Sequence, residues 1–217
     1  MKTDTELQKD VTEELKWDPR IVDDEIGVAV RGGVVTLTGS VPTVAQKWEA
    51  LQAVERVSGV RAIAQELTVK VPDKHQKSDT ELAHQIINTL LWDIEVPHEQ
   101  VRARVERGWV TLEGEVNWQF QRASAERAVR YQTGVAGLTN LITIKSHISA
   151  PDVAQRVKDA LRRSAETDAK RINVTASDGT ITLTGTVRSW AEREDAERAA
   201  WGTTGVTAVE DKLAIAL

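Results

Sequence analysis

The chain has 217 residues, no cysteine and a formal net charge of −5 at neutral pH. The lack of cysteine excludes a disulfide framework, a thiolate metal site and a cysteine nucleophile. The acidic balance argues against a general nucleic-acid-binding protein, which needs a basic face. No apolar run approaches the roughly 18 residues of a membrane-spanning helix. The sequence has seven tryptophans but only one phenylalanine and one tyrosine. This bias points to a special use of tryptophan.

The sequence contains three copies of one unit, which resets the expected number of domains. The segment Leu37–Val41 recurs at Leu112–Val116 and again at Leu183–Val187. The offsets of 75 and then 71 residues hold from end to end of each copy without an internal gap. We therefore predict three domains of about 70 residues, at 1–72, 76–147 and 149–217.

Each copy begins with the signature of a helix start. The patterns are Thr3-x-x-Glu6, Ser78-x-x-Glu81 and Ser149-x-x-Asp152. In such a capping box, the hydroxyl accepts from the third amide while the acid reaches back to the first. Apolar residues then follow at every fourth position, which predicts a helix with one core-facing stripe. In the first copy these residues are Leu7, Val11 and Leu15.

Two strands, a second helix and a last strand complete each copy. In the first copy, alternating apolar residues run over 26–30 and 35–41 with a glycine turn between them, which predicts an antiparallel hairpin. The second helices are expected to begin near Thr43, Asn117 and Ser189. They are expected to end at glycines in the left-handed C-terminal position, namely Gly59, Gly134 and Gly205. The predicted fold class is α+β: three tandem α-β-β-α-β units, each with two helices packed on one face of a three-stranded mixed sheet.

These residues resemble the BON domain, the bacterial osmotically-inducible and nodulation domain. The first copy supplies an Ile26-x-Val28 strand, the turn residue Gly33, a Val35-x-Leu37-x-Gly39-x-Val41 strand, and Gly59-Val60 after the second helix. The other copies supply the same positions, and Asn140 matches an asparagine of the family's last strand, where the first and third copies have Gln65 and Asp211. The likeness covers nearly the whole chain and extends to osmotically inducible stress proteins with tandem BON domains.

The resemblance implies a non-enzymatic, stress-associated protein that binds peripherally to membrane surfaces, often those with anionic phospholipid. An anionic phospholipid surface or an envelope protein is the expected partner, with self-association as a further option and with no nucleic acid. The alternative hypothesis is a structural or protein-interaction module whose domains pack together or mediate oligomerisation. The N-terminus shows no apolar signal-peptide core, so we expect a cytoplasmic protein, or a periplasmic one if an export signal has been removed.

Enzymatic chemistry finds little support in the residues. None of the four histidines recurs at the repeat offsets, and no His-x-x-x-His pair suggests a zinc site. Arg31-Gly32-Gly33 lies between two strands rather than before a helix, so it is a hairpin turn and not a phosphate loop. We therefore predict no catalytic residue, metal or cofactor. The glycines in mid-strand predict close backbone approach or a bulge under the second helix, with ligand contact as the weaker alternative. These glycines are Gly39, Gly114 and Gly185.

Tryptophan and basic residues are the functional lead, because they lie off the repeated core positions. Trp17 and Trp92 occupy equivalent places at the end of the first helix, where a ring with a polar N–H suits a boundary or caps a small core. Trp118 and Trp190 stand at the start of second helices, where we favour surface contact. In the third copy, a basic first helix and its loop are candidates for contact with anionic headgroups, and an ordinary solvated helix with acid-base pairs is the alternative. Their cations are Arg156, Lys158, Arg162, Arg163, Lys170 and Arg171.

Overall fold

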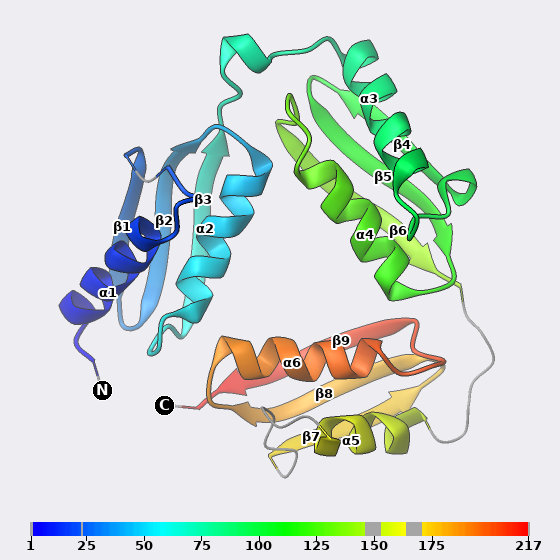
Figure 1. The fold of residues 1–217 in the computed structure, drawn as a ribbon. Helices are drawn as coiled ribbons and strands as arrows, with labels where there is room; N and C mark the ends of the chain where they lie inside the picture. The colour runs from blue at the N-terminus through cyan, green and yellow to red at the C-terminus, as the bar shows by residue number, and fades with distance from the viewer. Residues whose placement is uncertain (1, 23, 146–152, 164–170, 217) are drawn as a thin grey trace. The chain divides into compact units, whose positions relative to one another are not determined.

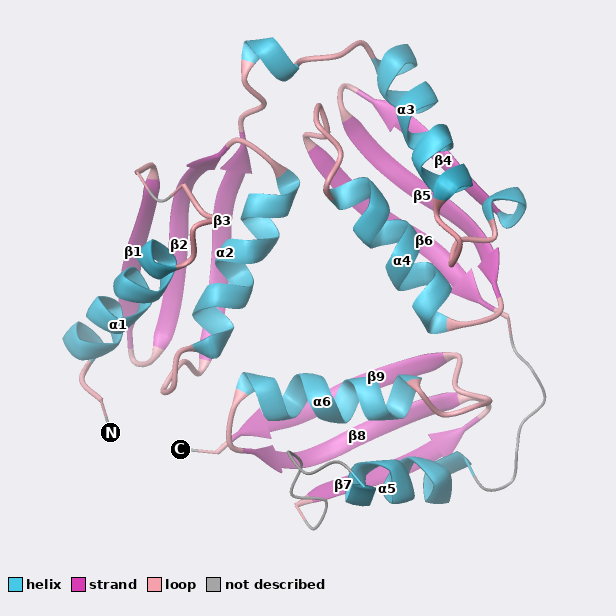
Figure 2. Cartoon of the chain, in the orientation of Figure 1, coloured by secondary structure: helices cyan, strands magenta, loops and turns pink. Residues whose placement is uncertain are grey.

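The computed structural model describes residues 2–22, 24–145, 153–163 and 171–216. Each copy of the repeat folds as predicted, and Figure 2 shows the same order of helices and strands in each. The first repeat contains α1 (Asp4–Trp17), β1 (Ile26–Arg31), β2 (Val34–Val41), α2 (Val44–Arg56) and β3 (Ala62–Val69). After η1 (Asp73–His75), the second contains α3 (Asp79–Trp92), η2 (His98–Gln100), β4 (Val101–Glu106), β5 (Trp109–Val116), α4 (Gln119–Arg130) and β6 (Gly137–Ile144). The third contains α5 (Val153–Arg163), β7 (Ile172–Ser177), β8 (Thr180–Val187), α6 (Trp190–Trp201) and β9 (Ala208–Ile215).

Each repeat builds one small mixed sheet, and the strand orders are β1-β2-β3, β4-β5-β6 and β7-β8-β9. The hairpin turn makes the first pair antiparallel, whereas the second helix acts as the crossover that a parallel third strand requires. Register is the same in all three hairpins, since the first residue of the first strand pairs with the mid-strand glycine: Ile26 with Gly39, Val101 with Gly114, and Ile172 with Gly185. The predicted fold class is confirmed.

A thin core lies between the sheet and its two helices, which cover the same face (Figure 1). In the first repeat, α1 packs against β1 and α2, and Val11, Val35 and Leu37 are fully buried. Ala50 and Ala53 are equally buried on α2, and their small side chains let the helix lie close to the strands. The other sheet face has no helix over it, so polar residues such as Thr36 and Thr38 alternate with the core residues.

The helix starts agree with the capping patterns. The Thr3 hydroxyl accepts from the Glu6 amide at 3.3 Å while a Glu6 carboxylate oxygen accepts from the Thr3 amide at 2.8 Å, and Ser78 with Glu81 forms the same box. The third pattern, Ser149-x-x-Asp152, lies outside the described residues. The expected helix ends are wrong by a few residues, because α2, α4 and α6 stop before the glycines. Those glycines instead form the turn into the last strand with φ near +100°.

The described chain divides into two compact units. The first is Met1–Val116 with Phe120–Ile142 and holds the first two repeats, and the second is Asn117–Gln119 with Thr143–Leu217. Contacts between the first and second repeats therefore lie within one unit.

Candidate functional site

The two tryptophans at the ends of first helices lie on the surface. Trp17 is 83% exposed and Trp92 is 84% exposed. Both follow the buried stripe of their helix by two residues, at Leu15 and Leu90, and this spacing turns the ring away from the core. Neither ring therefore fills a small core, and both are available to a partner.

In the second repeat, Trp92 belongs to a larger exposed apolar cluster that the sequence analysis missed. Ile87 and Leu91 are exposed on the outer side of α3, one helical turn apart, and Ile94 in the following loop is 100% exposed. The equivalent residues of the first repeat are Thr12, Lys16 and Pro19, so this cluster is specific to one repeat. Apolar residues at i and i+4 outside the buried stripe are the signal that could have revealed it.

The basic helix of the third repeat presents its cations outward. Val153, Val157 and Leu161 of α5 are buried, whereas Arg156, Arg162 and Arg163 are exposed and Lys158 is half-buried. The only carboxylate of α5, Asp159, pairs with Arg162 at 3.4 Å and accepts from Gln155 at 3.0 Å. Arg171, at the start of β7, is exposed, and Lys170 lies outside the described residues.

The other tryptophans have individual environments. Trp190 begins α6, half-buried, with the Arg193 guanidinium 5.1 Å from its ring centre; Trp118, before α4, is 42% exposed. Trp109 lies on the open sheet face directly over Gly137, where an added Cβ would clash with the ring. Trp201 packs against the core of the third repeat.

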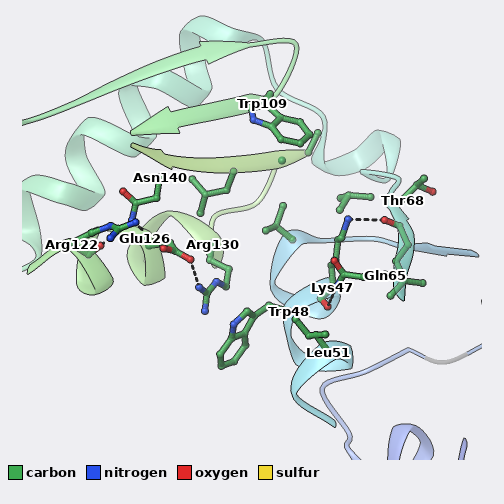
Figure 3. Close-up of a pocket in the computed structure, with 16 residues that line it drawn as sticks. Lys47, Trp48, Leu51, Gln65, Thr68, Trp109, Arg122, Glu126, Arg130 and Asn140 are labelled. Carbon is green, nitrogen blue, oxygen red and sulfur yellow. Dashed lines mark hydrogen bonds and ion pairs between the residues drawn. The ribbon is translucent and has the colours of Figure 1, made fainter. Parts of the chain in front are cut away.

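A groove of about 830 Å³ lies in the first unit, between the first and second repeats (Figure 3). One side is formed by α2 and β3 and the other by α4 and β6, with Trp109 of β5 beside them. The guanidinium of Arg130 lies 4.4 Å from the centre of the Trp48 ring and pairs with Glu126 at 2.6 Å. The labelled residues that line it are Lys47, Trp48, Leu51, Gln65, Thr68, Trp109, Arg122, Glu126, Arg130 and Asn140.

Beside this groove, a charge network connects the two repeats. The buried Glu49 of α2 pairs with Arg20 at 2.9 Å and accepts from the Tyr131 hydroxyl at 2.8 Å. The hydrogen bond to Glu49 raises the pKa of Tyr131. Arg20 also forms two side-chain bonds with the buried Asp18, which lower the pKa of that carboxyl below its usual range. Sequence reasoning missed this network because Glu49 and Tyr131 are far apart in the chain and occupy different repeat positions.

The mid-strand glycines lie where another backbone comes very close. A Cβ on Gly39 would lie 1.9 Å from the Glu25 carbonyl oxygen, and Gly114 and Gly185 would meet Gln100 and Arg171 in the same way. The approach is therefore to the residue before the first strand, and not to the second helix as expected.

Within the described ranges, no three His, Asp or Glu side chains come together as a metal site would require. No helix in the described parts of the chain is long and apolar enough to cross a bilayer.

The chain is similar to several known proteins. Osmotically-inducible protein Y of Escherichia coli (strain K12) is 32% identical over 125 residues, which cover 56% of this chain and 62% of that protein. The match thus spans less than two thirds of the relative's length. Two solved structures of CdsD, a structural protein of the type III secretion system of Chlamydia trachomatis, match with 16% and 17% identity. They cover 100% and 96% of this chain and 100% and 91% of theirs, both with a TM-score of 0.27, which is too low to carry an argument.

The BON domain family model matches this chain three times, at residues 3–71, 78–146 and 149–216. These matches cover nearly all of the sequence and coincide with the three small α+β units. The chain therefore belongs to the BON domain family.

Proposed function

We propose that this protein is a stress-associated, non-enzymatic binding protein that attaches peripherally to membrane surfaces containing anionic phospholipid. Membership of the BON domain family and the likeness to an osmotically inducible protein support the stress-related, non-enzymatic part. The lipid part rests on the surface chemistry of the repeats, taken one repeat at a time.

The observation that carries the proposal is the exposure of Trp17 and Trp92 at equivalent positions. A tryptophan ring with its polar N–H favours the interface between water and acyl chains. In the second repeat the fully exposed Ile94 and the outward side of α3 add aliphatic surface next to the ring. A water-exposed cluster of this kind is costly unless a partner covers it.

The basic helix α5 supplies attraction to anionic headgroups. Its four cations and one carboxylate leave a local charge of about +3. Each cation near an anionic leaflet is worth about 1 kcal/mol, so α5 would contribute about 3 kcal/mol at low salt. Salt screens exposed charges beyond a Debye length, so this contribution falls as ionic strength rises.

Co-sedimentation with vesicles tests the proposal. Vesicles of phosphatidylcholine alone are compared with vesicles containing phosphatidylglycerol, each at low and high salt. We expect binding only to the anionic vesicles, and we expect salt to weaken it. Substituting Arg156→Glu and Arg163→Glu together should abolish binding at moderate salt, and Trp92→Ser with Ile94→Ser should weaken it at every salt concentration.

Matched controls separate specific surfaces from overall charge and apolarity. Arg198→Glu changes the charge of the same repeat on the other helix, and Phe120→Ser removes a half-exposed aromatic ring of α4. Both control variants should bind as the unchanged protein does. Equal binding to neutral vesicles, or equal losses in controls and test variants, would contradict the proposal.

A structural or interaction module is the second candidate, and one observation favours it. Trp48 of the first repeat is covered by Arg130 of the second, and the Tyr131 hydroxyl donates to Glu49. Some aromatic side chains thus serve contact between repeats rather than contact with lipid. Quenching of tryptophan fluorescence by acrylamide without lipid distinguishes the two roles, because a single-tryptophan variant that keeps Trp92 should be quenched strongly and one that keeps Trp48 weakly.

A further inference from the structure

The last strand of every repeat lies at the edge of its sheet. In such a strand, alternate residues direct their backbone groups to the neighbouring strand and the residues between them direct theirs outward. The Lys70 amide, at the end of β3, donates to the Val41 carbonyl at 2.9 Å. Leu67, which has the opposite parity, therefore presents its N–H and C=O at the free edge. The equivalent outward residues are Ile142 of β6 and Leu213 of β9.

Two repeats cover this outward N–H with a side chain of the same strand. The Asn140 side-chain oxygen accepts from the Ile142 amide at 3.1 Å, and an Asp211 oxygen accepts from the Leu213 amide at 2.9 Å. The second helix holds each cap in place, because Asn140 donates to Glu126 at 3.0 Å and Asp211 pairs with Arg193 at 2.6 Å. A covered edge resists pairing with a foreign strand.

The first repeat lacks this cap. Gln65 occupies the position of Asn140 and Asp211, but its side chain is one methylene longer and donates to the Lys47 carbonyl of α2 at 3.2 Å. In the described first repeat, no side chain accepts from the Leu67 amide. The Leu67 carbonyl is covered only by the Lys47 ammonium, at 2.8 Å, which is a flexible and charged group.

Gln65, Leu67 and Thr68 of β3 line the groove between the first and second repeats, and Figure 3 labels Gln65 and Thr68 there. Trp48 and Leu51 of α2 offer apolar surface beside the strand, and Arg122 of α4 lies on the opposite side. The groove is lined by three cations, Lys47, Arg122 and Arg130, and by one carboxylate, Glu126. Because Glu126 pairs with Arg130, the remaining charge of the lining is positive. The far side of the groove is formed by α4 and β6, so a segment bound along β3 would lie between the strand and that wall.

We propose that the edge of β3 binds an extended acidic peptide segment of a partner protein by strand addition. The segment would accept from the Leu67 amide, place an apolar side chain against Trp48 and place carboxylates near Lys47 and Arg122. Backbone hydrogen bonds supply affinity in this mode, and alternate side chains supply selectivity. The site is independent of the lipid-binding surfaces.

The first test needs no ligand and measures amide hydrogen exchange by NMR in the full chain. The Leu67 amide should exchange about fivefold faster, relative to its own neighbours, than the Ile142 and Leu213 amides, a factor that corresponds to one typical hydrogen bond. Gln65→Asn, which copies the cap of the second repeat, should remove this difference. Asn140→Gln, the reverse change, should accelerate exchange at Ile142. Equal exchange at the three amides in the unchanged protein would overturn the inference.

The second test titrates the protein against a fluorescein-labelled hexapeptide of alternating valine and glutamate, followed by anisotropy. We expect saturable binding that slows exchange at Leu67, and we expect Gln65→Asn to weaken it about fivefold to tenfold. Asp211→Gln, which removes the equivalent cap of the third repeat, should leave the affinity unchanged. A peptide with lysine in place of glutamate should not bind, because it meets the cations of the groove.

Several outcomes would refute the proposal. They are no saturable binding of the acidic peptide, equal affinity of the Gln65→Asn variant with an unchanged melting curve, or protection of Ile142 instead of Leu67. Concentration-dependent dimerisation that Gln65→Asn abolishes would show that a second copy, and not a peptide, occupies the edge. Failure of vesicle binding would leave each of these results unaffected.

Discussion

The substitution Gly39→Ala should strongly destabilise the first repeat. The new Cβ would lie 1.9 Å from the Glu25 carbonyl oxygen, whereas carbon and carbonyl oxygen ordinarily stay about 3.3–3.6 Å apart. The two backbones would therefore have to separate by about 1.4 Å. That movement breaks the hydrogen bond from the Ser40 amide to Glu25, which is 3.3 Å long. The φ of +109° adds strain for any residue with a side chain.

These costs can be compared with the stability of a small domain. A lost hydrogen bond with an unsatisfied partner costs about 1–3 kcal/mol, and the unfavourable φ adds about 1–2 kcal/mol. The total is about 2–5 kcal/mol before any steric term. A domain of about 70 residues has a free energy of unfolding of about 3.5–10 kcal/mol. These two costs alone thus remove between about a fifth and all of the stability of the repeat.

Gly32→Ala is the matched control, because Gly32 also has a positive φ, of +58°, but an added Cβ would meet nothing within 4 Å. It should cost only the unfavourable φ, about 1–2 kcal/mol. Urea unfolding of the full chain, with hydrogen exchange read on peptides of the first repeat, measures both variants. Equal losses in the two variants would refute the steric argument. A stable Gly39→Ala protein with altered ligand binding would instead favour a ligand contact at this glycine.

Three further predictions concern the first unit. Glu49→Gln should lower the pKa of Tyr131, because the carboxylate that stabilises the neutral phenol is gone. Tyr131 is the only tyrosine of the sequence, so tyrosinate absorbance reports its titration directly. An unchanged titration would mean that the contact is absent in solution. Asp18 should make the first repeat acid-sensitive: its folded-state pKa is below the unfolded value, so its contribution is complete above about pH 4 and declines as the pH falls further. Asp18→Asn should flatten that decline in urea unfolding measured against pH. A double-mutant cycle of Trp48→Ala and Arg130→Ala should give a coupling of about 0.5–2 kcal/mol, and additive losses would contradict the stacking.

Local patterns predicted the fold well because they are short-range and occur three times. Capping at Thr3 and Ser78 and the buried stripe of α1 depend on residues three or four apart, which a sequence displays directly. The predicted end of the second helix lies a few residues too far along the chain, because α2 ends at Arg56 and Gly59 forms the turn into β3. Where the three copies share a residue, the sequence indicates the core.

The candidate sites could be predicted only in part, because they depend on residues that the repeats do not share. The exposure of Trp17 and Trp92 follows from their offset to the core stripe, but the sequence left a core role equally open. The contact of Trp48 with Arg130 joins different positions of two repeats, so no periodicity reveals it. The missing edge cap at Gln65 requires knowing which strand lies at the sheet edge and where its side chain points.

A difference between the first two repeats also explains how each of them keeps its own second helix. In the first repeat, Arg20 in the loop after α1 pairs with Glu49 of α2 at 2.9 Å. In the second, the same loop position holds Glu95, which accepts from the Ser124 hydroxyl of α4 and pairs with Arg127 at 3.0 Å.

Exchanging the second helices between these two repeats would place Glu49 against Glu95 and leave Arg20 beside a serine. Tandem repeats are prone to such exchange during folding, since every copy offers the same apolar surface. A reversed charge at an otherwise equivalent contact penalises the wrong pairing without changing the core. The first two repeats are thus alike where the fold requires it and opposite in charge where each loop contacts its own second helix.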